Sequence, residues 1–162
     1  MEKIVLLTET HIRKDFKSTH QVFANYLINN VTQDIKRNVA SCYVIANEDD
    51  NVVAYYTLSN DSVPKELVPE WADKIRYNRL PVTLLGRLAA HKDYEGQGLG
   101  RYLLSDALLR CAEKSSSIAS VAVVTDPFDD DAAGFYKKFG FEQMPGGRII
   151  IPMKTIISIF NK

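Results

Sequence analysis

A glycine-rich segment near the middle of the chain has the composition of an anion-binding turn: Glu95-Gly96-Gln97-Gly98-Leu99-Gly100-Arg101. It lies between a mostly apolar run typical of a buried strand and a stretch with helical apolar spacing. Glycine lets the backbone turn sharply and approach a ligand, because no Cβ stands in the way. The first N–H groups of the following helix and its dipole point to the same place. We predict a phosphate site to which Arg101 can add a contact; a plain strand-to-helix turn is the alternative.

The spacing of these glycines excludes two other phosphate motifs. Glycines at 96, 98 and 100 lack the G-x-G-x-x-G spacing of dinucleotide-binding turns, and no Gly-Lys-Ser/Thr follows as in the NTPase phosphate loop. No His, Cys or Asp spacing supports a metal site, so none is predicted.

No residue stands out as a general base. Four aspartates between positions 126 and 131 can attract a cationic amine or bind a metal, but a helix N-terminus also favours negative charge, and we prefer that interpretation. His11 and His20 show no partner spacing and are expected at the surface. His91 is expected at a solvated strand end.

The order of apolar patterns predicts an α/β arrangement with antiparallel edges. Strands are expected at Val5–Leu7, Ser41–Ala46, Val52–Leu58, Val82–Ala90, Val121–Thr125, Phe141–Met144 and Arg148–Lys154. Helices are expected after the capping residues Ser18/Thr19, at Val31–Val39, from Leu99 to Cys111 and at Asp129–Phe139, with a short one inside Val63–Arg79.

Length and composition are those of one globular domain. Lys plus Arg and Asp plus Glu each number 20, so global charge does not favour a nucleic-acid partner. No run approaches the ~18 apolar residues of a membrane span, and no signal peptide is recognised. Cys42 and Cys111 lie in apolar patterns and are expected to be buried free thiols of a reducing compartment. The expected location is therefore cytoplasmic, with no membrane partner.

Two segments together resemble the GNAT superfamily of N-acetyltransferases. LLGRLAAHKDYEGQGLGRYLLSDAL (84–108) is similar to the family's signature strand, loop and helix, and Gly98 and Gly100 match the loop's two small positions. AAGFYKKFGFE (132–142) is similar to the family's Ala-x-x-Phe/Leu-Tyr-x-x-x-Gly-Phe motif, and Asp129 stands where the family often has Asn. The resemblance covers about Ser41 to Lys154. It implies one GNAT-type domain over 1–162, with a mixed central sheet of about six to seven strands, a central parallel pair and flanking helices.

The resemblance also implies acetyl-CoA as cosubstrate. In the family the loop's amides hold the pyrophosphate, and the pantetheine arm pairs with the preceding strand. Here these positions are the loop 95–101 and the backbone of Leu88, Ala89 and Ala90. Glu95 departs from the family, because this position is usually Arg or Gln, and a carboxylate does not help a pyrophosphate; its side chain is expected to point away. Asp129, Ala132 and Phe135 are expected as further cofactor contacts.

Tyr136 occupies the position at which the family places a tyrosine near the CoA sulfur, which implies a general acid. Without the resemblance, Tyr136 would be interpreted as a helix-face aromatic like Phe135 and Phe139. A backbone N–H at or near Leu88 is the expected donor to the thioester carbonyl.

Three hypotheses remain for the acceptor. FKSTHQVFANYL (16–27) and VVAYYTLSNDSVP (52–64) resemble toxin-type GNATs, which acetylate the α-amine of aminoacyl-tRNA and are paired with a ribbon-helix-helix antitoxin. The second hypothesis is a GNAT for a small amine, peptide or protein lysine, and the third is a non-catalytic acyl-CoA-binding module. The oligomeric state stays open, a homodimer included.

Basic residues bear on this choice. The segment 11–37 holds five Lys or Arg against two Asp, and Lys74, Arg76, Arg79, Arg87 and Lys92 are candidates to join it on one face; a mixed-charge solvated surface is the alternative. Arg87 lies inside a buried run, where a charge requires a partner. It is expected to contact substrate or to pair with an acidic neighbour.

Overall fold

A computed structural model describes residues 3–161. Its strands are β1 (Val5–Leu6), β2 (Ser41–Ala46), β3 (Val52–Pro64), β4 (Arg79–Ala90), β5 (Ala122–Thr125), β6 (Glu142–Gln143) and β7 (Ile149–Pro152). Its α-helices are α1 (Gln21–Asn29), α2 (Val31–Lys36), α3 (Leu99–Lys114), α4 (Asp130–Lys137) and α5 (Met153–Phe160). Three short 3-10 helices are η1 (Lys65–Leu67), η2 (Glu70–Ala72) and η3 (Lys92–Tyr94).

The strands form one mixed sheet in the order β1-β2-β3-β4-β5-β7-β6. β4 and β5 pair in parallel, with Thr83 opposite Val123 and Leu85 opposite Thr125. β1–β2, β2–β3, β5–β7 and β6–β7 pair antiparallel. The predicted mixed sheet with a parallel pair and antiparallel edges is confirmed, as is the final hairpin.

The chain divides into two compact units, each described by itself below. Unit 1 consists of Met1–Ser59 and Gly86–Ala107, and unit 2 of Asn60–Leu85 and Leu108–Lys162.

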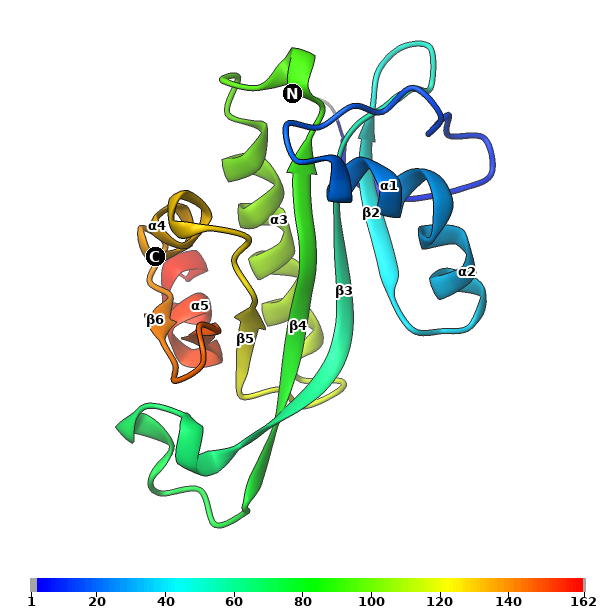
Figure 1. Ribbon diagram of the computed structural model, residues 1–162. Helices are drawn as coiled ribbons and strands as arrows, with labels where there is room; N and C mark the ends of the chain where they lie inside the picture. Colours follow the sequence, from blue (N-terminus) through cyan, green and yellow to red (C-terminus); the bar gives the residue numbers. More distant parts are fainter. Residues whose placement is uncertain (1–2, 162) are drawn as a thin grey trace. The chain divides into compact units, whose positions relative to one another are not determined.

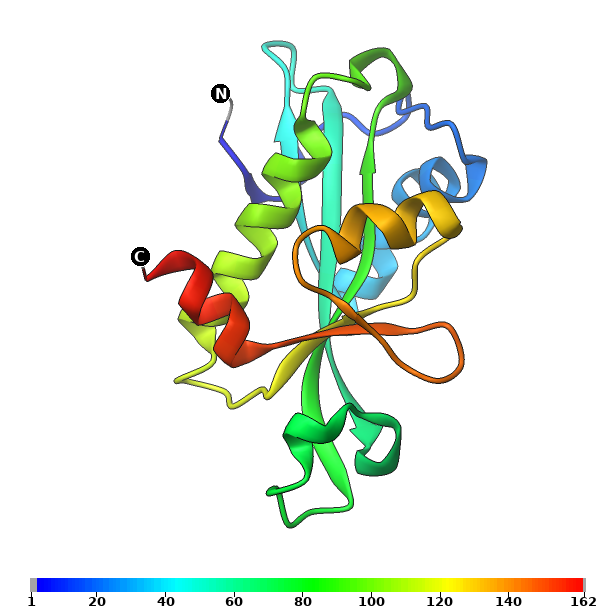
Figure 2. The ribbon, with the colours of Figure 1, turned by 90° about the vertical axis from the view of Figure 1, so that its left-hand side faces the viewer.

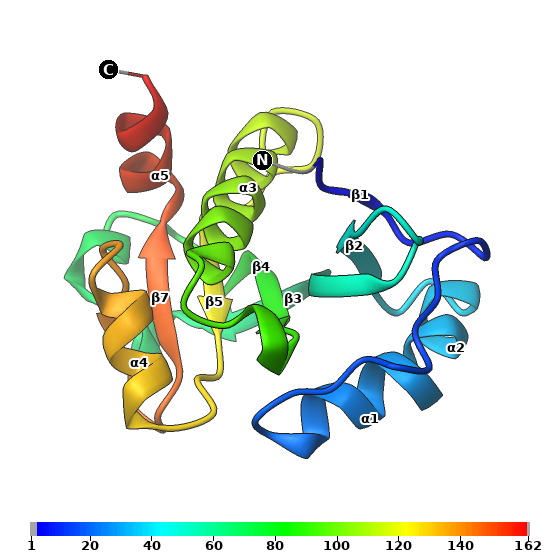
Figure 3. The same cartoon turned by 90° about the horizontal axis from the view of Figure 1, so that it is seen from above.

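In unit 1, helices cover both faces of the strands (Figures 1 and 3). Successive strand residues point to opposite faces, and in β3 both Tyr55 and Tyr56 are fully buried. The Tyr55 hydroxyl donates to the carbonyl of Phe23 in α1 (2.7 Å), whereas the Tyr56 hydroxyl donates to the carboxylate of Asp106 in α3 (2.6 Å). Burial on both faces explains why this part of β3 is continuously apolar instead of alternating.

Side chains of the segment before α1 form hydrogen bonds with the backbone at both ends of this helix. The N-cap is His20 rather than the predicted Ser18 or Thr19, although Ser18 Oγ still accepts the Ala24 N–H (3.2 Å). At the other end, the Arg13 guanidinium donates to the carbonyl of Leu27 (2.7 Å), where a helix favours positive charge. Arg13 therefore has a structural task, which removes one cation from the predicted basic face.

In unit 2, the sequence analysis missed α5. The residues Ile149–Ile151 pair with β5 as a strand, but Pro152 has no N–H to donate and ends β7. α5 then begins at Met153, directly after β7 (Figure 2). Ile156 is fully buried while Ile157 and Ile159 are about two-fifths exposed, so α5 buries one face and exposes another.

The irregular segment 63–79 of unit 2 contains η1 and η2, where one short helix was predicted, and β3 and β4 extend further into it than predicted. Lys65 Nζ donates to the carbonyls of Asp73 and Ile75 and so fixes this loop. Figure 2 shows the loop between the ends of β3 and β4 that belong to unit 2. No helix among residues 3–161 is long and apolar enough to span a membrane.

Candidate active site

The glycine loop of unit 1 has the backbone that its sequence predicts. Gly96 and Gly98 both have φ of +80°, a region that residues with a Cβ rarely adopt. Nothing lies within 4 Å of a Cβ placed on either residue, so the conformation, not crowding, requires glycine. α3 begins directly afterwards at Leu99, with the Tyr102 N–H bonded to the Gly98 carbonyl (3.1 Å). Backbone N–H groups that precede the first hydrogen-bonded turn of a helix, as those before Tyr102 do here, are the groups that bind phosphates at helix starts in proteins.

The two charged residues of the loop differ in their surroundings. Arg101 is exposed in the first turn of α3. The Glu95 carboxylate accepts a hydrogen bond from the Thr19 hydroxyl (2.6 Å), a residue of the segment that precedes α1. This contact gives the Glu95 carboxylate a partner within the protein. That its side chain points away from a bound pyrophosphate stays a prediction.

The strand that precedes the loop continues past its pairing with β5. The recorded β4–β5 register ends at Leu85 and Thr125, while β4 runs to Ala90. Ala89 is buried in the core of unit 1, and Leu88 and Ala90 are partly exposed. At its end, the His91 N–H bonds to the Val53 carbonyl (2.7 Å).

Thr57 and Gly86 form a close contact between β3 and β4 in unit 1. The buried Thr57 hydroxyl accepts the Arg87 N–H (3.1 Å), and a Cβ at Gly86 would lie 2.7 Å from that hydroxyl. Neither residue was predicted from the sequence, because the local pattern of a strand does not indicate which residue of the next strand its threonine or glycine will contact.

We therefore expect Gly86→Ala to lower the free energy of unfolding by about 1–3 kcal/mol, as overpacking does in well-packed cores. Urea unfolding of the wild type, Gly86→Ala, Thr57→Ala and the double variant measures this effect. Because Thr57→Ala removes the clashing oxygen, the two changes should be non-additive, with the double variant more stable than their sum predicts. Additive losses would show that the strain lies elsewhere.

His91 is a structural residue of unit 1, and the prediction that it marks a solvated strand end is wrong. Its side chain is only 12% exposed and packs edge-on against Phe16 and Tyr94. Nδ1 accepts the Asp93 N–H (3.1 Å), which leaves the proton on Nε2, 3.3 Å from the Asp15 carbonyl. Both ring nitrogens of His91 therefore contact backbone groups of unit 1. As predicted, His11 lies near the surface; it accepts the Thr8 N–H at 3.0 Å.

In unit 2, Tyr136 lies in α4 and is only 7% exposed. Its ring packs against Phe135 and Phe141 at centroid distances of 5.3 and 5.4 Å. Burial raises the pKa of Tyr136 to about 12, against which a hydrogen bond with the Thr125 side chain acts in part. The phenol therefore keeps its proton at neutral pH.

The acidic cluster of unit 2 is mostly a helix start, as we preferred. Asp129 is the N-cap of α4 and accepts the Ala132 N–H (2.8 Å), and Asp130 and Asp131 fill the first turn. Asp126 has another partner: Arg148 forms two hydrogen bonds to its carboxylate (2.8 and 2.9 Å) and a third to Asp61 (2.9 Å). These carboxylates raise the pKa of Arg148 further above its usual value, mainly through the bonds to Asp126.

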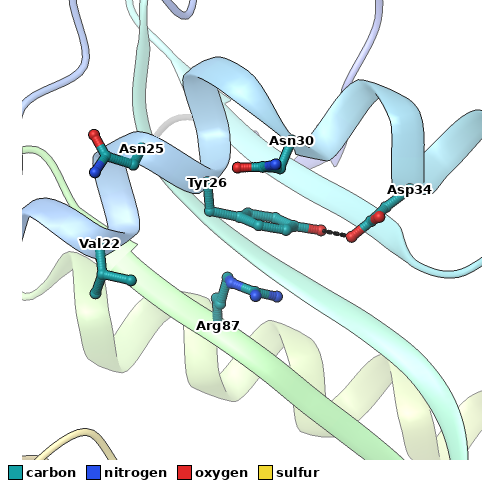
Figure 4. A pocket seen from close by; sticks show the side chains of 6 residues that line it. All are labelled: Val22, Asn25, Tyr26, Asn30, Asp34 and Arg87. Atoms are coloured by element: carbon teal, nitrogen blue, oxygen red, sulfur yellow. Dashed lines mark hydrogen bonds between the residues drawn. The ribbon is translucent and has the colours of Figure 1, made fainter.

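Arg87 lies in a pocket of unit 1, and the sequence analysis did not predict its neighbour. The guanidinium carbon is 3.5 Å from the centre of the Tyr26 ring, and the Tyr26 hydroxyl donates to Asp34 (2.7 Å) (Figure 4). Burial raises the pKa of Tyr26 above its usual range, and Asp34 adds to this while Arg87 opposes it. Of the two predicted alternatives, pairing with an acidic neighbour is replaced by a contact with an aromatic ring.

The two thiols are inert, as predicted. Cys42 and Cys111 are buried free cysteines, and burial raises the pKa of each thiol to about 12. Neither is a nucleophile at neutral pH. Among the described residues, no three His, Cys, Asp or Glu side chains lie together as metal ligands would.

Comparison with known proteins agrees with this geometry. Residues 39–143, which include the glycine loop and Tyr136, match the family model described as acetyltransferase (GNAT) domain. The "tRNA-acetylating toxin" of Mycobacterium tuberculosis (strain ATCC 25618 / H37Rv) is 32% identical over 130 residues, which cover 80% of this chain and 78% of that protein.

Two solved structures share the fold. AtaT complexed with acetyl-methionyl-tRNAfMet has a TM-score of 0.92 at 22% identity, covering 99% of this chain and 100% of that one. A tyrosine-to-phenylalanine mutant of the toxin AtaT, bound to the C-terminus of the antitoxin AtaR and acetyl-CoA, has a TM-score of 0.84 at 22% identity, covering 100% and 99%. The family match and the 32% identity, on a chain with this loop and this sheet, identify the protein as a member of the GNAT acetyltransferase family.

Proposed function

We propose that this chain transfers the acetyl group of acetyl-CoA to the α-amine of an aminoacyl-tRNA. The cofactor is supported by the family and by the two left-handed glycines at the start of α3. The acceptor rests on one observation, the 32% identity over about four-fifths of both chains to a protein named for tRNA acetylation. Both substrates occur in the cytoplasm, and we propose that the enzyme acts there.

Acetyl-CoA would bind along unit 1 in two parts. The pyrophosphate would contact the N–H groups of the loop 95–101, beside the Arg101 guanidinium. The pantetheine arm would follow the backbone of Leu88, Ala89 and Ala90, where β4 runs past its register with β5. Asp129, Ala132 and Phe135 are proposed as further contacts.

The proposed chemistry requires little help from a base. The α-amino group has an ordinary pKa of about 7.7–8.0, so a large fraction is neutral near pH 8 without a protein acceptor. The amine nitrogen attacks the thioester carbon, and the Leu88 N–H stabilises the oxygen that becomes negative. The C–S bond then breaks, the Tyr136 phenol donates its proton to the leaving sulfur, and the amine's extra proton passes to water, from which the phenol regains a proton.

The raised pKa of Tyr136 predicts how kcat depends on pH. A phenol with the usual pKa of 10.0 would lose its proton, and so its function, on approaching pH 10, whereas at about 12 it stays protonated. We expect kcat to rise with deprotonation of the acceptor amine and then to stay level through pH 10. Measurements of kcat over a pH series, with a check of enzyme stability at each pH, test this expectation. A decline in kcat centred below pH 10 would contradict the assignment of Tyr136 as the acid.

The function itself is tested by incubating the protein with labelled acetyl-CoA and a charged total tRNA pool. A panel of polyamines and peptides runs in parallel. Label on charged but not on uncharged tRNA is the expected result, and it also identifies the amino acids that are modified. Label on a small amine or peptide alone would reject the tRNA acceptor, and no label at all would favour a binding module.

We propose a ribbon-helix-helix antitoxin as protein partner, because the related toxin AtaT is known bound to the antitoxin AtaR. Co-expression with small DNA-binding proteins from the same locus tests this, with restored growth and co-purification as the expected outcome. Size-exclusion chromatography with light scattering decides between a monomer and a homodimer.

A further inference from the structure

The pocket of unit 1 brings together polar groups of opposite character (Figure 4). Its volume is about 380 Å³, within the range of small-ligand pockets, which starts near 300 Å³. Its walls come from α1, α2, the residue between these helices and β4, namely Val22, Asn25, Tyr26, Asn30, Asp34 and Arg87. One lining residue, Arg87, directly precedes Leu88 in β4, whose amide is proposed to polarise the thioester.

The Tyr26 ring holds the Arg87 guanidinium in place. The ring is 5% exposed, stacks with Tyr55 (6.5 Å, 17°) and is tied through its hydroxyl to Asp34. A guanidinium 3.5 Å above a ring centre lies against the ring face, so its N–H groups point outward from its edge. Arg87 is thus a fixed hydrogen-bond donor at the pocket wall.

Asp34 supplies the opposite character in the same pocket. Its carboxylate accepts one hydrogen bond from Tyr26 and, being acceptor-only when ionised, has further lone pairs. Arg87 and Asp34 carry opposite charges, so each offsets the attraction of the other for a phosphate or an ammonium. The pocket therefore fits a neutral group that presents a donor next to an acceptor.

Nucleobases differ in how hydrogen-bond donors and acceptors follow one another along the edge of the base. On the Watson–Crick edge, adenine and cytosine each place an amino donor beside a ring nitrogen acceptor, whereas guanine and uracil place a carbonyl acceptor beside a ring N–H donor. Carboxylates accept from such amino groups, arginine donates to ring acceptors, and single-stranded RNA ends are read on these edges. The unpaired 3′ end of tRNA has the sequence C-C-A, so each of its bases presents the matching pair.

We infer that this pocket binds an amino-bearing base of the tRNA 3′ end, with Asp34 accepting from its amino group and Arg87 donating to its ring nitrogen. The inference rests on the proposed function. It makes Arg87 and Asp34 specificity-determining residues that select an adenine or cytosine and position the ester-linked amine near Leu88.

The test uses acceptor-stem RNAs charged chemically at the 3′ end, with each of the last three bases changed in turn. At one of these positions, a change to G or U should lower kcat/KM by about tenfold or more, whereas exchange between A and C should cost less. Equal rates with all four bases at all three positions would overturn the inference while leaving tRNA acetylation intact. Failure to acetylate any charged RNA would instead reject the proposed function.

Variants provide the second arm. Asp34→Ala and Arg87→Met, which remove the acceptor and the donor, should raise KM for the charged RNA and flatten its base preference. The same variants should keep their kcat/KM for an amino-acid methyl ester, which has no base, and their KM for acetyl-CoA. Asp49→Ala and Lys154→Met, exposed residues outside the pocket and outside the basic segment 11–37, are the matched controls and should match the wild type. An equal loss on the methyl ester would show a general role in the active site and overturn the inference.

Discussion

Replacing Tyr136 by phenylalanine is expected to lower kcat by about 10²- to 10⁴-fold, the usual contribution of a general acid. The change removes one hydroxyl and keeps the ring that packs against Phe135 and Phe141, so the shape of α4 is preserved. Binding of acetyl-CoA should change little, because the proposed role concerns the leaving sulfur. Steady-state kinetics with charged tRNA and calorimetric titration with acetyl-CoA separate the two effects.

Tyr56→Phe is the matched control for this variant. Tyr56 is also a fully buried tyrosine, and its hydroxyl donates to Asp106 (2.6 Å). Loss of this bond should cost about 1–3 kcal/mol of stability, since the bond is one to a charged group, with kcat nearly unchanged. If Tyr136→Phe reduced acetyl-CoA binding and turnover in equal measure, Tyr136 would be a packing residue only.

Gly98→Val is expected to weaken acetyl-CoA binding by about tenfold to a hundredfold. At φ +80° a β-branched residue is strained by about 1–3 kcal/mol, and the loop can relieve that strain only by moving its N–H groups. The space around the Gly98 Cβ position is open, so the side chain would also occupy the surface proposed for the pyrophosphate. The dissociation constant for CoA, measured by calorimetry, gives the size of the effect.

Gly146→Val controls for the strain alone. Gly146 has φ of +90°, also with open space around its Cβ position, but lies in the turn between β6 and β7 of unit 2. It should lose similar stability while its affinity for CoA stays near that of the wild type. Unchanged CoA affinity in Gly98→Val would show that the pyrophosphate binds elsewhere and would reject the proposed function of the loop.

These residues also show which features of the protein can be predicted from local sequence. The glycine turn, the Asp129 cap and the β6–β7 hairpin depend on backbone preferences within a few residues, so the sequence by itself determined them. The burial of Cys42 and Cys111 follows in the same way from apolar patterns in single elements. The family motifs then supplied Tyr136 and the cosubstrate, which no periodicity would have found, because Tyr136 resembles any other aromatic on a helix face.

Only the tertiary structure decided which distant side chains meet. Arg87 was conspicuous as a charge in an apolar run, but its neighbour Tyr26 and that residue's partner Asp34 come from helices far earlier in the chain. The Thr57 hydroxyl at Gly86 and the two backbone contacts of His91 are likewise invisible to local pattern. The physical reason is that such contacts depend on strand order, register and the rotation of each helix about its axis. These are set by the packing of the whole core and not by any residue's neighbours in sequence.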